Sequence, residues 1–326
     1  MDLDKLIKDP NDFEDERDIG SGQFGVVKLV KDKRDKKKKY ALKQIPEESQ
    51  DSDSQKLFIR EVLTLYTLDH PAILRINGFS IPSQKDKSYY IFTEFMPNGN
   101  LKEVKLKEKA GECPEGFTAT KKTICLIGIA AGMKFVHKEN IMHRDLKPEN
   151  IFFDKDFYPK IADFGLARLF EENGHITSNL GTPYFMAPEL FDDDDEITKA
   201  IDVYAFGVLV LSLFEPDFKF AATKQPKNLS QLVQHIKNGK RFVIPKGVPE
   251  EYIKLIDRCW ATDPRDRPTF DEIYDTVTKD DSFYLEDADD DEIKEYIKSI
   301  EEYVNKNTEE EDEQQKYEET EEFDFE

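Results

Sequence analysis

The most restrictive feature of this chain is a series of polar motifs in its middle. In chain order these motifs are H-R-D-L-K-P-E-N at residues 143–150, D-F-G at residues 163–165 and A-P-E at residues 187–189. The intervening residues 151–153 and 160–162 are short apolar runs of the kind that form strands. If the two runs pair, they return Asn150 and Asp163 to one place, so the motifs predict a compact polar site on a hairpin.

The side chains of these motifs suit chemistry on a phosphate. Asp145 is an acceptor that can orient an attacking hydroxyl and take its proton. Lys147 is a cation that can contact a transferring phosphate. Asn150 and Asp163 offer the oxygen ligands that Mg²⁺ prefers, and this ion usually takes only one or two protein ligands beside substrate phosphates. A solvated loop gives no reason for these four residue types to recur at these intervals.

This ordered set resembles the motifs of the eukaryotic protein kinase family. The resemblance covers residues 13–278 and implies a bilobal α+β fold, with ATP as the phosphate donor and Mg²⁺ as the metal. The implied N-lobe, residues 13–96, is a small five-stranded sheet with one helix, called helix C. The implied C-lobe, residues 97–278, is larger and mainly helical. Residues 1–12 are then an irregular lead-in, and residues 279–326 are an acidic tail.

Three glycines near the start, Gly20, Gly22 and Gly25, have the spacing G-x-G-x-x-G, which also occurs in dinucleotide-binding folds. In those folds the glycines open a helix, whereas here they precede the strand-like residues 26–30, so we expect them at the tip of a hairpin. Glycine lets the backbone approach phosphates closely. By resemblance, this hairpin covers the nucleotide, and the segment between the lobes binds adenine. The implied nucleotide contacts are Ile19, Gly20, Ser21, Gly22, Gln23, Phe24, Gly25, Val27, Ala41, Lys43, Thr93, Glu94, Met96 and Phe152.

An ion pair is expected beside the nucleotide. Lys43 ends a short strand-like run, and residues 55–68 carry apolar side chains at helical spacing. Glu61 lies on that predicted helix. The resemblance implies that Glu61 pairs with Lys43, which contacts the α- and β-phosphates.

The resemblance also implies two supports in the C-lobe. Asp202 opens an apolar segment, residues 202–214, which is typical of a buried helix. This aspartate is expected to brace the loop that carries Asp145. Arg267 is expected to pair with Glu189 and so tether the segment that ends there.

Lys147 predicts that the phosphate is transferred to serine or threonine hydroxyls, because its K-P-E-N sequence resembles that of serine/threonine kinases. Tyrosine-kinase-like stretches are E-F-M-P-N-G-N-L at residues 94–101, D-V-Y-A-F-G at residues 202–207 and C-W-A-T-D-P-R-D-R-P-T-F at residues 259–270. The combination resembles the tyrosine-kinase-like (TKL) group, which generally acts on serine and threonine. The alternatives are a tyrosine or dual-specificity kinase and a pseudokinase scaffold. A scaffold commonly lacks an essential lysine or acid, whereas Lys43, Asp145 and Asp163 are all present.

Regulation is predicted from Arg144, which precedes the catalytic aspartate. In the family this arrangement often indicates control by phosphorylation of the activation loop. Thr177 and Ser178 are the candidate sites for an upstream kinase, and a phosphate there is expected to pair with Arg144. A plain polar loop is the alternative interpretation.

The net charge of -22 is concentrated at the C-terminal end. From Asp280 onward there are 22 acidic and 4 basic residues, which leaves -4 for the rest of the chain. This distribution argues against nonspecific binding to nucleic acid or an anionic membrane. Protein substrates are what the resemblance to the protein kinase family implies. The sequence predicts neither a signal peptide nor a membrane span. The three cysteines are widely spaced and form neither a disulfide framework nor a metal-ligand pattern. We therefore expect a reducing environment, the cytoplasm, with the nucleus as an alternative.

Within the acidic tail, apolar residues at helical spacing predict an amphipathic helix at about residues 290–304. These residues are Ile293, Tyr296, Ile297, Ile300 and Val304. Asp290 or Asp291 is expected to cap the helix. The helix either packs on the C-lobe or binds a partner, and residues after 306 are expected to be disordered. The acidic charge is expected either to attract basic substrates or to inhibit by covering the nucleotide cleft.

Overall fold

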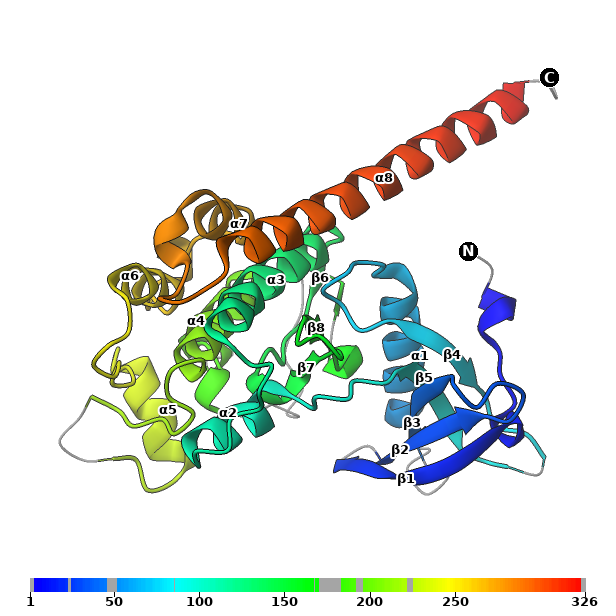
Figure 1. The fold of residues 1–326 in the computed structure, drawn as a ribbon, viewed down its shortest axis with the longest axis horizontal. Helices are drawn as coiled ribbons and strands as arrows, with labels where there is room; N and C mark the ends of the chain where they lie inside the picture. Colours follow the sequence, from blue (N-terminus) through cyan, green and yellow to red (C-terminus); the bar gives the residue numbers. More distant parts are fainter. Residues whose placement is uncertain are drawn as a thin grey trace.

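The computed structural model of this chain describes residues 3–22, 25–45, 52–84, 86–166, 168–169, 183–191, 196–221 and 225–323. Figure 1 shows that most strands gather in one lobe, near the N-terminus, and most helices in the other. The predicted bilobal α+β architecture is therefore confirmed.

The N-lobe is one antiparallel sheet with a single long helix packed on it. Its elements are β1 (Phe13–Gly22), β2 (Gly25–Asp32), β3 (Lys39–Ile45), α1 (Ser52–Thr67), β4 (Ile76–Ser80) and β5 (Tyr89–Glu94). The strand order is β1-β2-β3-β5-β4. Phe58, Val62 and Leu65 of α1 are buried, so the apolar face predicted from helical spacing is the face that packs.

The lead-in before β1 is ordered rather than irregular, which corrects the expectation. It contains two 3-10 helices, Leu3–Leu6 and Pro10–Asp12. The amide of Lys8 donates to the carbonyl of Phe79 at 2.9 Å, and Ile7 forms a parallel bridge to the same residue. The lead-in thus satisfies backbone groups at the edge of β4, where they would otherwise face solvent.

The C-lobe is built mainly from helices. Its helices are α2 (Leu101–Lys109), α3 (Ala119–Lys138), α4 (Ala200–Ser212), α5 (Leu229–Lys237), α6 (Glu250–Cys259) and α7 (Phe270–Lys279). Its strands are β6 (Ile141–Met142), β7 (Ile151–Phe153), β8 (Pro159–Ile161) and β9 (Arg168–Leu169), which pair as β6 with β9 and β7 with β8. Further 3-10 turns are Pro148–Asn150, Phe164–Leu166, Pro183–Phe185, Pro188–Phe191, Pro264–Asp266 and Asp281–Phe283. Every residue of α4 after Ala200 is buried, as expected for a helix that is apolar all round.

Two glycines in α3 lower its intrinsic helix propensity, and close packing explains both. A Cβ atom on Gly128 would lie 2.4 Å from the Tyr296 hydroxyl oxygen. A Cβ atom on Gly132 would lie 2.7 Å from Cδ1 of Ile161. The helix is therefore held by tertiary contacts with the tail and with β8.

The acidic tail forms one helix, α8 (Asp290–Phe323), which is longer than predicted. Figure 1 shows it crossing the C-lobe beside α3 and then extending beyond the body. The expectation of disorder after residue 306 is corrected. The physical reason is that residues 306–323 contain no glycine or proline and are rich in glutamate, glutamine and lysine, which favour helix.

The cap of α8 also differs from the expectation. The Asp289 carboxylate accepts hydrogen bonds from the amides of Asp291 at 3.0 Å and Glu292 at 3.1 Å. The amide of Asp289 itself donates to the Thr120 hydroxyl at 2.8 Å. The cap is therefore one residue earlier than Asp290, and it is attached to α3.

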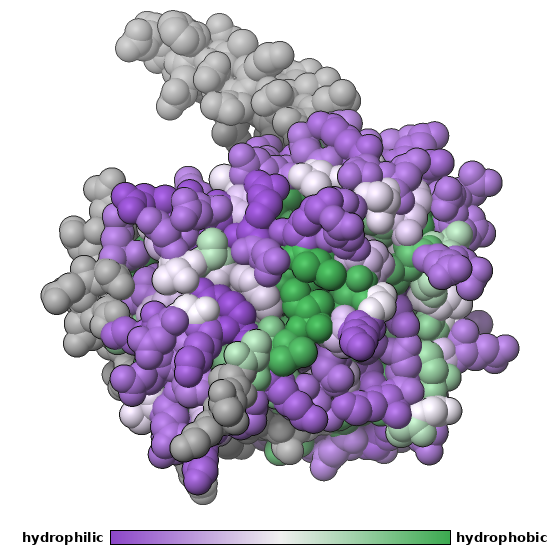
Figure 2. Space-filling view, turned by 90° about the vertical axis from the view of Figure 1, so that its left-hand side faces the viewer, coloured by the Kyte–Doolittle hydropathy of each residue, from purple (hydrophilic) through white to green (hydrophobic). Residues whose placement is uncertain are grey.

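The surface is mainly hydrophilic. Figure 2 shows one end of the molecule, where hydrophilic side chains surround a central apolar patch. Exposed apolar side chains of the C-lobe include Leu106, Leu229 and Val243. Among the described residues, no helix has both the length and the apolar content needed to cross a membrane.

Candidate active site

The loop after β6 is fixed from behind by Asp202 of α4, as predicted. Its carboxylate accepts hydrogen bonds from the amides of His143 at 2.9 Å and Arg144 at 2.8 Å. The same carboxylate lies 2.9 Å from Nε2 of His137, a contact for which the sequence offered no signal. Burial alone would raise the pKa of Asp202, but the hydrogen bonds and charge around it lower the pKa below its usual value. The buried carboxylate therefore holds the loop in one conformation.

Asp145 and its neighbours form a compact polar group. Lys147 Nζ lies 2.5 Å from Asp145 Oδ2, and the Asn150 side-chain amide nitrogen lies 3.0 Å from the same oxygen. Burial raises the pKa of the Asp145 carboxyl, and Lys147 opposes this effect. A carboxylate of this kind takes up a proton more readily than a solvated aspartate, which suits a group that accepts a proton from a hydroxyl.

The β7–β8 hairpin brings Asn150 and Asp163 together, as predicted from the two apolar runs. Ile151 pairs with Ile161, and the amide of Ala162 donates to the carbonyl of Asn150 at 2.9 Å. The side-chain amide nitrogen of Asn150 is also held by the Asp145 carbonyl at 2.8 Å. This nitrogen faces Asp145, so the amide oxygen is left for a ligand on the other side.

These donors fit the Mg²⁺ that the motifs imply. An amide oxygen and a half-exposed carboxylate, Asp163, are hard oxygen ligands, and substrate phosphates and water usually complete such a site. Asp163 also has a positive φ of 66°, which sets it apart from the neighbouring strand. Among the described residues, no three His, Cys, Asp or Glu side chains gather into an all-protein metal site.

Lys43 and Glu61 form the predicted ion pair. Lys43 Nζ lies 2.8 and 2.7 Å from the two Glu61 carboxylate oxygens and 3.9 Å from Asp163. Burial lowers the pKa of Lys43, but the carboxylates outweigh burial and raise it. Phe164, the middle residue of the D-F-G motif, is fully buried with its ring 4.7 Å from that of His143. Lys43 is thus a fixed cation between the two lobes.

The glycine-rich segment forms a hairpin tip, as its strand-like flank predicted. Gly22 pairs with Gly25 at the end of β1 and β2. Gly25 has a φ of 135°, and a Cβ atom there would lie 1.8 Å from the Gln44 carbonyl oxygen, so no other residue fits. Gln23 and Phe24, and the side chain of Ser21, lie outside the described parts of the chain.

The other implied nucleotide contacts are spread over adjacent strands. On the sheet, Val27 pairs with Lys43, and Ala41 pairs with Thr93. The remaining positions are Ile19 and Gly20 on β1, Glu94 at the end of β5, Met96 just beyond it, and Phe152 on β7. The segment after β5 contacts β7 directly, because Asn100 bridges to Phe152. The sheet and the C-lobe hairpin therefore approach each other at this segment.

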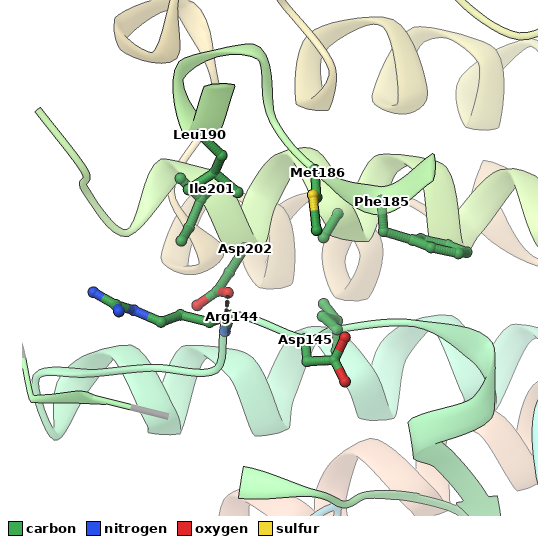
Figure 3. Close-up of a pocket in the computed structure, with 9 residues that line it drawn as sticks. Arg144, Asp145, Phe185, Met186, Leu190, Ile201 and Asp202 are labelled. Atoms are coloured by element: carbon green, nitrogen blue, oxygen red, sulfur yellow. Dashed lines mark hydrogen bonds between the residues drawn. The ribbon is translucent and has the colours of Figure 1, made fainter. Parts of the chain in front are cut away.

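A small pocket lies beside the catalytic loop, between that loop and the A-P-E segment (Figure 3). It is lined by Arg144, Asp145, Leu146, Phe185, Met186, Leu190, Ile201, Asp202 and Ala205. In Figure 3 the Arg144 and Asp145 side chains leave the loop in different directions. Phe185 and Met186 thus form an apolar wall close to Asp145.

The A-P-E segment is fastened by the predicted pair of Glu189 and Arg267. The two guanidinium nitrogens lie 2.6 and 2.9 Å from the two carboxylate oxygens, and both side chains are buried. The guanidinium also donates to the carbonyls of Ala261 and Ala200, each at 2.9 Å. A bidentate contact of this kind fixes the orientation of the two side chains as well as the distance between them.

A glycine hairpin, a fixed lysine, two oxygen donors that suit Mg²⁺ and a carboxylate that suits proton transfer thus form a site whose chemistry fits phosphoryl transfer. A family model described as the protein kinase domain matches residues 13–278. The chain belongs to the protein kinase family.

Three relatives illustrate the similarity. The chain is 32% identical over 263 residues to a putative serine/threonine-protein kinase/receptor of Acanthamoeba polyphaga mimivirus, covering 80% of this chain and 15% of that protein. It is 36% identical over 230 residues to a probable LIM domain-containing serine/threonine-protein kinase of Dictyostelium discoideum, covering 68% of this chain and 22% of that protein. It is 30% identical over 330 residues to receptor-interacting serine/threonine-protein kinase 1 of Homo sapiens, covering 94% of this chain and 46% of that protein. The chain thus spans less than half the length of each of these relatives.

Proposed function

We propose that this chain transfers the γ-phosphate of ATP to serine or threonine hydroxyls of protein substrates. The observation that carries the proposal is the contact of Lys147 with Asp145 at 2.5 Å, within a K-P-E-N loop of the serine/threonine type. The names of the three relatives, all serine/threonine-protein kinases, support it. We also propose membership of the TKL group, on the tyrosine-kinase-like stretches that accompany this loop, and a cytoplasmic or nuclear location, because all three cysteines are unpaired.

The proposed mechanism depends on positioning and on neutralising charge, because phosphoryl transfer needs little covalent chemistry from the protein. Asp145 orients the substrate hydroxyl and accepts its proton. Lys147 contacts the γ-phosphate, and Lys43, held by Glu61, contacts the α- and β-phosphates. Asn150 and Asp163 would hold Mg²⁺ through their side-chain oxygens, and the bound ion would supply further positive charge.

The specificity is tested by phosphoamino-acid analysis after transfer from γ-labelled ATP with Mg²⁺ to a generic protein substrate. We expect label on serine or threonine. Label on tyrosine would contradict the specificity and keep the transferase activity. Binding of ATP with no transfer above background would favour the pseudokinase scaffold.

We further propose that an upstream kinase activates the chain at Thr177 or Ser178, both of which lie outside the described residues. A phosphate there would pair with Arg144 and order the activation loop. Replacing both residues with alanine is expected to lower kcat/KM at least about tenfold, because a hydrogen bond to a charged group contributes about 1.5–3 kcal/mol. The assay measures kcat/KM of the wild type and of the double-alanine variant, each purified from cells and assayed with and without phosphatase treatment. Full activity in the double-alanine variant would rule the proposal out.

A further inference from the structure

The first half of α8 is part of the C-lobe core. Ile293, Tyr296 and Ile300 are at most 7% exposed, and they join the same apolar cluster as α3 and α7. The Tyr274 hydroxyl of α7 contacts Glu301 at 3.4 Å. The protein kinase match ends at residue 278, so this packing lies outside it.

One turn of α8 contacts the tip of the β7–β8 hairpin. The rings of Tyr158 and Tyr296 stack with centroids 5.0 Å apart and planes at 24°. The Glu292 carboxylate accepts hydrogen bonds from the Tyr158 hydroxyl at 3.3 Å and from Lys121 Nζ at 2.5 Å. Lys121 Nζ also lies 3.9 Å from the Tyr158 ring centroid. Tyr158, which is partly buried, therefore contacts a ring, a cation and a carboxylate.

This hairpin carries the two implied metal ligands. Tyr158 directly precedes β8, which leads to Asp163, and β7 begins directly after Asn150. The amide of Ile161 in β8 donates to the carbonyl of Ala72, in the loop between α1 and β4, at 2.8 Å. A two-stranded hairpin with three-residue strands is marginal on its own, so its position depends on such outside contacts.

The next turns of α8 approach the loop that follows α1. Tyr303 lies about two turns beyond Tyr296. Burial and a hydrogen bond with Asp69 raise the pKa of the Tyr303 hydroxyl. The helix that bears Glu61 ends just before Asp69, so this part of α8 lies near the end of α1 as well as beside the β7–β8 hairpin.

We propose that the first half of α8 positions the phosphoryl-transfer site. Glu292 and Tyr296 hold Tyr158, and thereby set the position of Asn150 and Asp163 relative to the lysine of the N-lobe. These two tail residues are positioning residues, because they act through the hairpin and touch no substrate. The meaning of this inference for catalysis depends on the proposed function.

The chain offers a matched pair of variants at Tyr296. Its hydroxyl is buried with no hydrogen-bond partner among the described residues, so Tyr296→Phe keeps the stacked ring and loses nothing that is paired. Tyr296→Ala removes the ring. Glu292→Gln is a milder change, which keeps the size of the side chain but removes the charge next to Lys121.

The test uses the full chain and measures three quantities. Calorimetry gives the Kd for Mg·ATP, steady-state assays give KM and kcat, and circular dichroism gives the melting temperature. At a temperature where all variants are folded, Tyr296→Ala is expected to weaken Mg·ATP binding by about 2- to 30-fold, the range for residues that modulate a site from a distance. Tyr296→Phe is expected to bind like the wild type, and Glu292→Gln to fall between them.

A lower melting temperature with unchanged Kd and KM in Tyr296→Ala and Glu292→Gln would overturn the inference, because α8 would then only stabilise the lobe. If Tyr296→Ala does not fold, the comparison of Glu292→Gln with the wild type decides. If the wild type binds Mg·ATP but transfers no phosphate, the proposed function fails, while the Kd comparison still decides the role of α8.

Discussion

Replacing Asp145 by asparagine is expected to lower kcat for phosphoryl transfer by about 10²–10⁴-fold, the usual contribution of a general base. Asparagine keeps the size of the side chain and can still contact Lys147 and Asn150, but it cannot take the proton of the hydroxyl. The affinity for Mg·ATP is expected to change little, because Lys43 and Asp163 do not depend on this carboxylate for their positions.

The measurement is the initial rate at saturating ATP and protein substrate, together with the Kd for Mg·ATP. Asp156→Asn is the matched control, because Asp156 is an exposed aspartate at the turn of the β7–β8 hairpin. This control variant is expected to keep full activity. A rate for Asp145→Asn close to that of Asp156→Asn would exclude Asp145 as the proton acceptor.

Much of the site was predictable because its residues lie in dense local motifs. Two short apolar runs were enough to place Asn150 and Asp163 at the two ends of one hairpin, since such runs, when a short polar loop separates them, pair as neighbouring strands. The β-branched flank of the glycines distinguished a hairpin from the helix of a dinucleotide site. The pair of Lys43 and Glu61 followed from the resemblance, and the structure confirms it at 2.7–2.8 Å.

Other features had no local signal. Tyr158 and Tyr296 meet only because α8 crosses α3, and no spacing in the sequence relates two residues so far apart. The partnership of His137 with Asp202 likewise depends on two helices coming together. The tail was misjudged after residue 306 because its acidic composition suggested disorder, whereas its residues have high helix propensity. Local patterns thus predict elements and motif roles, while contacts between distant elements require the fold.

Replacing Arg267 by methionine is expected to lower the free energy of unfolding by about 3–5 kcal/mol, because the buried carboxylate of Glu189 loses its partner. The carbonyls of Ala261 and Ala200 lose a donor as well. Arg265→Met is the matched control. Arg265 also pairs with an aspartate, Asp263, at 2.6 Å, but its side chain is 88% exposed, so the expected loss is below about 1 kcal/mol.

Urea unfolding of the two single variants and of the double variant Arg267→Met/Glu189→Leu measures this difference. The double variant is expected to recover part of the loss, because replacing both members of a buried pair by apolar residues leaves no unpaired charge. Equal losses in Arg267→Met and Arg265→Met would show that burial adds nothing to the pair. Because Glu189 fastens the segment that carries Phe185 and Met186, activity should fall with Arg267→Met even at temperatures where the variant stays folded.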